Sequence, residues 1–175
     1  MKEKVFELYI QDPMGVKGDW FFLPMPENEL EVKLKSLFKE GDYIIASYTD
    51  NRGFVINEYS NLKELNEIAQ TIIDVGVDLK ELEIVGSYEL YSPSDLLQKV
   101  LDRDFCIIYP NPDTCSYVGS EEALGETLYE EGFLDIEIPQ NLVDLGYIDF
   151  EAIGRNESIN KGWRYNQQHG AWVKA

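Results

Sequence analysis

Acidic side chains are the residues of this sequence whose spacing first suggests chemistry. Glu121 and Glu122 are adjacent, as are Glu130 and Glu131, and paired carboxylates are the groups that glycosidases use as acid and base. Successive residues of a helix, however, point about 100° apart, so two neighbours in sequence do not face one substrate. We therefore expect no enzymatic activity from these pairs. A hydrolase would also need a reactive cleft, of which the sequence gives no sign.

The sequence also lacks the motifs of common catalytic and metal sites. It has no Gly-rich phosphate loop, nucleophile elbow, HExxH zinc motif or EF-hand loop. Cys106 lies in an apolar run, where we expect a buried thiol, and Cys115 lies in a loop rich in Pro, Asn and Asp. The lone His169 is expected in a turn and adds no second metal ligand. We expect no cofactor and no metal.

A second pattern among the acids has the period of a helix. Ser120 is a suitable N-cap for a helix running to about Glu131, and Glu122, Glu126 and Glu130 recur on one of its faces. Such neighbours lie about 5–6 Å apart at their Cβ atoms, a spacing comparable to that of neighbouring phosphates, and their like charges repel. The candidate partner-binding carboxylates are Glu121, Glu122, Glu126, Glu130, Glu131, Asp135, Glu137, Asp144, Asp149 and Glu151.

The acidic segment lacks the cations that normally relieve such repulsion. Residues 104–154 contain twelve Asp or Glu residues and no Lys or Arg. Elsewhere the chain does supply cations at favourable helical spacing, as in Glu29–Lys33 and Glu31–Lys35. Basic residues return only afterwards, at Arg155, Lys161, Arg164 and Lys174. These either fold back on the acidic segment or serve only as counter-charge.

The overall charge restricts the class of partner. The 175 residues carry a net charge of −18, yet 44% are hydrophobic, so the chain has enough apolar material to fold. Binding to nucleic acid or to an anionic membrane would have to overcome repulsion, and we expect neither. At one charge per about 1.7 Å of DNA axis, this charge corresponds to roughly 30 Å of duplex. No signal peptide or transmembrane run is evident, so we expect a soluble cytoplasmic protein with a basic partner.

Hydrophobic periodicity and turn residues predict the elements that position these side chains. In the first half we expect strands at 5–10, 43–48 and 54–56, a bulky apolar element at 19–24 and a turn at 50–53. We also expect four helices there. The first runs from Pro26 to about Glu40 with Gly41 as the stop, the second begins at a cap at Ser60 or Asn61, the third covers 77–84, and the fourth begins at Ser92-Pro93. In the second half we expect a strand at 104–109, helices at 120–131 and between Pro139 and Gly146, and strands at 162–165 and 171–174 around a turn at His169-Gly170.

These elements predict an α+β chain of three small modules. Residues 1–60 form an N-terminal α/β module, residues 61–103 a mostly helical middle module, and residues 104–175 an acidic C-terminal α/β module. The segment 147–172 combines many aromatic residues with less negative charge. We therefore expect the C-terminal module to form a homodimer. Trp20, Trp163 and Trp172 are expected in packing and not in base stacking.

Several local patterns now coincide in one order along the chain. They are GDWFFLP at 18–24, YIIASY at 43–48, INEYSNLKELN at 56–66, YIDFEAIGR at 147–155 and His169-Gly170. With these patterns in this order, the sequence resembles the ArdA family of antirestriction proteins. Members of that family are encoded by mobile genetic elements, namely plasmids, conjugative transposons and phages. The resemblance covers nearly the whole chain, and the block at 147–155 is its most distinctive part. Residues 104–125 and 133–139 depart from the family pattern.

The resemblance implies an elongated, dimeric mimic of DNA without enzymatic activity. Such a protein occupies the DNA-binding groove of type I restriction–modification enzymes and blocks restriction, and modification with it. Its contacts are many and individually modest, so neutralising Glu126 alone should barely weaken inhibition. The alternative is an acidic immunity-type module that neutralises a basic protein such as a nuclease toxin. Competition separates the two, because duplex DNA displaces a mimic whereas an immunity protein is selective for its toxin.

Overall fold

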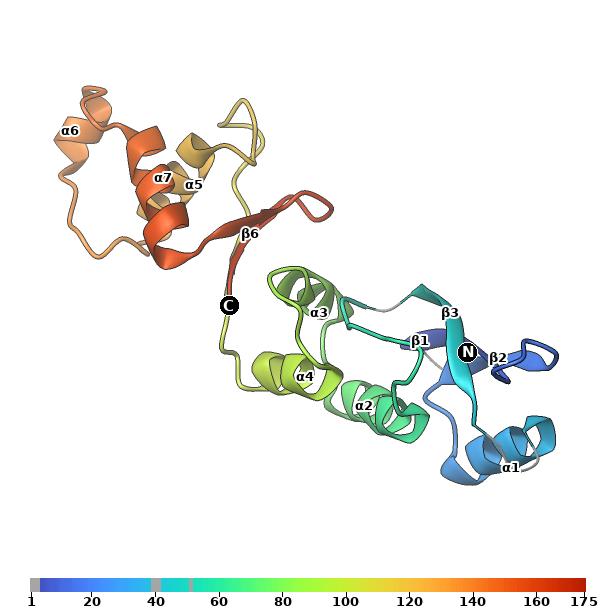
Figure 1. Ribbon diagram of the computed structural model, residues 1–175. Helices are drawn as coiled ribbons and strands as arrows, with labels where there is room; N and C mark the ends of the chain where they lie inside the picture. The colour runs from blue at the N-terminus through green and yellow to red at the C-terminus, as the bar shows by residue number, and fades with distance from the viewer. Residues whose placement is uncertain (1–3, 39–41, 51) are drawn as a thin grey trace. The chain divides into compact units, whose positions relative to one another are not determined.

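The computed structural model describes residues 4–38, 42–50 and 52–175 (Figure 1). The chain divides into two compact units, Met1–Asp102 and Arg103–Ala175. Over the described residues it contains seven helices and two three-stranded antiparallel sheets, which confirms the expected α+β class. The division into three modules stays a prediction.

The elements follow one another along the chain with these bounds. The first unit contains β1 (Phe6–Gln11), β2 (Gly18–Leu23), α1 (Glu27–Leu37), β3 (Ile44–Asp50), α2 (Leu62–Val75), α3 (Leu79–Gly86) and α4 (Pro93–Leu101). The second unit contains β4 (Cys106–Ile108), α5 (Glu121–Glu130), α6 (Gln140–Asp144), α7 (Phe150–Lys161), β5 (Arg164–Asn166) and β6 (Ala171–Lys174).

The sheet of the first unit has β1 at its centre, paired antiparallel with β2 and β3. Phe6, Leu8 and Ile10 alternate along β1 and are fully buried, as expected for a strand with one face on a core. Phe54 packs edge-on against Phe6 with 5.1 Å between ring centroids. The expected strand at 54–56 is wrong, because these residues are not paired in a sheet. The alternation there reflects the burial of Phe54 and Ile56 in the core.

Capping side chains begin α2 and α4 where the sequence predicts them. Of the two candidate caps for α2, the structure uses Asn61, whose side-chain oxygen accepts from the amide of Lys63 at 2.9 Å. The helix ends at Gly76, which has a left-handed φ of 73°. Asn66 of α2 makes two bonds to the backbone of Met25, at 2.9 and 3.0 Å, and so ties α2 to the segment after β2.

Two expectations for α1 have different outcomes. Lys35 does pair with Glu31 at 3.4 Å. Lys33 instead reaches Asp19 at 2.9 Å. The expected end of this helix at Glu40 and Gly41 lies outside the described residues, as does Asn51 of the expected turn at 50–53.

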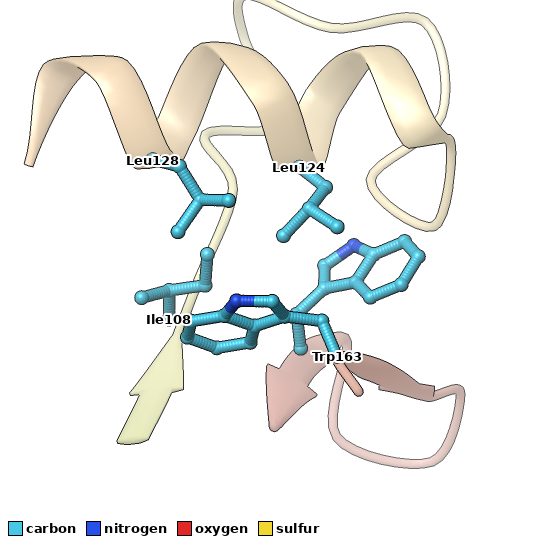
Figure 2. Close-up of a cluster of buried hydrophobic side chains, with 5 residues drawn as sticks. Ile108, Leu124, Leu128 and Trp163 are labelled. Atoms are coloured by element: carbon cyan, nitrogen blue, oxygen red, sulfur yellow. The ribbon is translucent and has the colours of Figure 1, made fainter. Parts of the chain in front are cut away.

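The second unit folds around a small aromatic and aliphatic core. Its sheet has the order β4-β6-β5, with β6 in the centre. Leu124 and Leu128 project from α5 toward Ile108 and Trp163 (Figure 2). Trp163 and Trp172 are each only 5% exposed, which confirms that they pack in the core. Cys106 is half-buried beside this cluster and not fully buried as expected, because it lies at the start of an edge strand.

The helix α7 is absent from the sequence-based expectations. Its side chains lack an apolar stripe, and only Gly154 and Glu157 are buried. Its ends nevertheless follow ordinary rules, because Asp149 accepts from the amide of Ala152 at 2.9 Å and Gly162 ends the helix with a φ of 76°. Figure 1 shows α7 beside α5.

Candidate functional site

The helix α5 holds the regular stripe of carboxylates. Ser120 caps it by accepting from the amide of Ala123 at 3.1 Å. Leu124 and Leu128 are fully buried and fix the inward face of the helix. The stripe of Glu122, Glu126 and Glu130 is therefore carried on the rest of the helix surface, as predicted. Glu122 and Glu130 are exposed, and the Glu126 side chain is half-buried.

Most of the ten candidate carboxylates reach solvent. Glu121 and Glu126 are half-buried, and the other eight are exposed. Three of these lie in α5 or directly after it, and two lie at the start of α7. Asp149 and Glu151 therefore lie beyond the stripe on α5. They are the N-cap and the first turn of a second helix.

Arg155 of α7 supplies positive charge to two of the candidates. Its Nε lies 2.8 Å from Oε2 of Glu121, and its Nη2 bonds to Glu151. The hydrogen bond to Glu121, followed by the charges of both carboxylates, raises the pKa of Arg155 above its ordinary value. The basic residue of the 147–155 block thus folds back on the acidic segment.

Lys161, at the end of the same helix, compensates two more acids. Its Nζ bonds to Asp135 and lies 3.1 Å from Oε1 of Glu157. The hydrogen bond from Lys161 lowers the pKa of Asp135. The Glu157 side chain is only 9% exposed, so Lys161 compensates an almost buried carboxylate.

The remaining seven candidates have no ion pair with Lys or Arg in the part of the chain that the structure describes. They are Glu122, Glu126, Glu130, Glu131, Glu137, Asp144 and Asp149. Among them, Glu126 has a pKa above its ordinary value of 4.5, first because it is partly buried and then because Glu122 and Glu130 are negative. Three of these seven carboxylates, Glu122, Glu126 and Glu130, lie on α5.

A groove of about 610 Å³ lies beside this stripe. Its lining includes Glu126, Tyr129 and Glu130 of α5, Gln140 and Val143 of α6, and Phe150 of α7. The Tyr129 hydroxyl donates to Oε1 of Gln140 at 2.7 Å, and the rings of Tyr129 and Phe150 lie 5.6 Å apart. No described lining residue is Lys or Arg. Sequence reasoning missed this groove because it depends on α7.

Two glycines bring α5 and α7 into contact. A Cβ atom on Gly125 would lie 2.1 Å from the carbonyl oxygen of Phe150. A Cβ atom on Gly154 would lie 1.8 Å from the carbonyl oxygen of Glu121. Only glycine permits this approach of the two backbones. The contact fixes the start of α7, and therefore Phe150, against the helix that carries the stripe.

The other expected features concern His169, metals and membranes. His169 lies in the turn between β5 and β6, as predicted. Within the residues that the structure describes, no cluster of His, Cys, Asp and Glu is arranged to hold a metal ion. No described helix is long and apolar enough to cross a membrane.

The sequence model of a family described as antirestriction protein (ArdA) matches residues 15–171. The match covers most of both compact units and contains all ten candidate carboxylates. A search of curated proteins found no match.

Proposed function

Because this chain belongs to the ArdA family of antirestriction proteins, we propose that it mimics DNA in the DNA-binding groove of a type I restriction–modification enzyme. ArdA proteins are non-enzymatic inhibitors, so the chain acts by binding and not by turnover. The bound chain keeps the methyltransferase core away from DNA. It thereby blocks restriction of incoming mobile DNA in the cytoplasm, and modification with it.

The observation that carries this proposal is the set of seven carboxylates without an internal ion pair over the described residues. DNA-binding grooves hold phosphates with Lys and Arg side chains. Carboxylates four residues apart on α5 present negative charge at a spacing comparable to that of phosphates. The Lys and Arg side chains of the groove can therefore bind either DNA phosphates or the carboxylates of this chain.

The energetics favour many weak contacts. An exposed ion pair contributes about 0.2–1 kcal/mol, so tight binding needs several of them together. The net charge of −18 also steers the chain toward a basic groove and away from DNA itself. Arg155 and Lys161 reduce the repulsion among the acids but leave the exposed face of α5 negative.

Competition with DNA tests the proposal. A short fluorescent duplex is bound to a purified type I methyltransferase core, and the chain is added at increasing concentration. We expect the chain to displace the duplex without binding the duplex itself, and excess unlabelled DNA to reverse the effect. A core that still binds DNA while the chain saturates it would exclude mimicry. Selective binding to another basic protein, unaffected by DNA, would favour an immunity-type module.

A further inference from the structure

The groove beside α5 combines two kinds of lining. Glu126 and Glu130 contribute carboxylates, and Tyr129 and Phe150 contribute aromatic rings. Its volume of about 610 Å³ is within the range of small-molecule pockets, roughly 300–1,000 Å³.

The aromatic part of the groove is held in place by its neighbours. The Tyr129 hydroxyl is engaged by Gln140 at 2.7 Å, and the Gln140 amide in turn donates to Asp144 at 2.9 Å. The backbone of Phe150 contacts α5, because its carbonyl oxygen occupies the place where a Cβ atom on Gly125 would lie, and its ring packs against that of Tyr129 at 5.6 Å. A ligand would thus meet preformed rings and would not have to order them.

The acidic part of the groove favours a cation. Glu126 is half-buried and has Glu122 and Glu130 as charged neighbours on the same helix, and these conditions raise its pKa. Arg155 and Lys161 are both engaged with other acids, Glu121, Glu151, Asp135 and Glu157. An external cation would remove this repulsion, so its binding is favoured at the groove more than at an exposed, isolated carboxylate.

Resting on the proposed function, we infer that this groove receives one arginine side chain of the restriction enzyme. A planar guanidinium stacks on an aromatic ring while its N–H groups bond to carboxylates. An ammonium group lacks the flat face and the forked donors. The arginine is one that otherwise contacts a DNA phosphate, so this chain offers it a carboxylate and an aromatic ring together. Binding energy is then concentrated at Glu126, Glu130 and Tyr129 and is not spread evenly over the acidic residues. This inference replaces the expectation from the sequence that neutralising Glu126 alone barely weakens inhibition.

Charge-neutral variants test this concentration. The dissociation constant for a type I methyltransferase core is measured for the natural chain, Glu126→Gln, Glu131→Gln and Glu67→Gln. Glu131 is a candidate outside the groove, and Glu67 is an exposed residue of α2 in the other unit. We expect Glu126→Gln to weaken binding at least tenfold, Glu131→Gln by less than threefold, and Glu67→Gln hardly at all. Thermal unfolding shows that each variant is folded.

The outcomes separate the two proposals. If the natural chain binds but the Glu126 and Glu131 variants lose affinity equally, the groove inference is overturned and mimicry stands. If the natural chain does not bind the core, the proposed function fails. The inference that the arginine comes from a restriction enzyme then fails as well.

A small-molecule probe tests the groove without the enzyme. N-acetyl-arginine amide is titrated into the natural chain, and the ring signals of Tyr129 and Phe150 are followed by NMR. Tyr59 is the control, because it is 77% exposed and hydrogen-bonded to Glu58 but lies outside the groove. We expect the two groove rings to shift, the Tyr59 ring to stay, and the shifts to vanish in Glu126→Gln. Equal shifts at Tyr59, or equal shifts with N-acetyl-lysine amide, would overturn the inference.

Discussion

Gly154 of α7 lies against the backbone of Glu121 in α5, so closely that a Cβ atom on Gly154 would be 1.8 Å from the Glu121 carbonyl oxygen. Replacing a glycine by alanine inside a helix normally stabilises it by about 0.5–1 kcal/mol. Here Gly154→Ala must separate the helices, so we expect a loss of about 1–3 kcal/mol, typical of overpacking. Urea unfolding measures the change, and Asn160→Ala on the exposed face of α7 is the control. A stabilised Gly154→Ala variant would contradict the close approach.

Lys161 should matter for stability through the buried carboxylate of Glu157. Lys161→Met leaves this side chain, only 9% exposed, without its cation, and a buried polar group without a partner costs about 1–3 kcal/mol. We expect the loss to shrink in the double variant Lys161→Met/Glu157→Gln, because the uncompensated charge is then gone. Chemical denaturation of the four proteins in this cycle provides the measurement. Equal stability of the single and double variants would refute the role of Glu157.

Glu126 should make stability depend on pH. Its pKa in the folded chain is raised above 4.5, so the folded state holds the proton more tightly than the unfolded chain does. The stability it contributes is complete below pH 4.5 and is lost as the pH rises through the folded pKa. Glu126→Gln should therefore stabilise the chain near pH 7, by about 0.4–1 kcal/mol from the two repulsive i,i+4 pairs alone. Melting temperatures near pH 7 and near pH 4 should differ between variant and natural chain only at the higher pH.

Salt should weaken binding to the restriction enzyme. Exposed charges are screened beyond a Debye length of about 8–10 Å at moderate salt. Neutralising Glu122, Glu131 and Glu137 together should remove about 0.6–3 kcal/mol of binding and reduce the salt dependence. Affinities at several salt concentrations, for this variant and the natural chain, test the expectation. An affinity that salt leaves unchanged would argue against an electrostatic mimic.

The chain should form a homodimer through its second unit. The segment 147–172 is rich in aromatic residues, and Tyr147, Leu145 and Ile136 of the same unit are each more than 60% exposed. Sedimentation at micromolar concentration and moderate salt should give twice the chain mass of 20.2 kDa. Tyr147→Glu should shift the distribution toward the monomer, whereas Tyr59→Glu in the first unit should not. A single-chain mass for the natural protein would exclude the dimer.

Local sequence signals were sufficient for most elements of the fold. The cap and apolar stripe of α2 and the Ser92-Pro93 start of α4 are properties of neighbouring residues, and the structure confirms both helices. The predicted strand at 54–56 was wrong, because burial of every second side chain in a core gives the same alternation of apolar residues as a strand. Pairing with another strand is a long-range property that the alternation alone does not contain.

The candidate site was less accessible to sequence reasoning. The stripe on α5 follows from helical spacing, but its surroundings depend on α7, whose packing relies on glycine and not on an apolar stripe. Because the sequence did not predict α7, two roles remained open for Arg155 and Lys161, namely folding back on the acidic segment or serving only as counter-charge. The structure pairs them with Glu121 and Asp135. The groove also remained hidden, because Phe150 and Gln140 reach it only through the tertiary fold.

The order of strands in the second unit has a consequence for biosynthesis. Its central strand, β6, is the last element of that sheet along the chain, and both β4 and β5 pair with it. The first unit can fold while the ribosome is still extending the chain, since domains generally fold as units in the order of their synthesis. The second unit cannot complete its sheet until Lys174 has left the ribosome. The acidic helices therefore emerge before the strand that completes the sheet beneath them, and a premature stop before residue 171 would release them without that support.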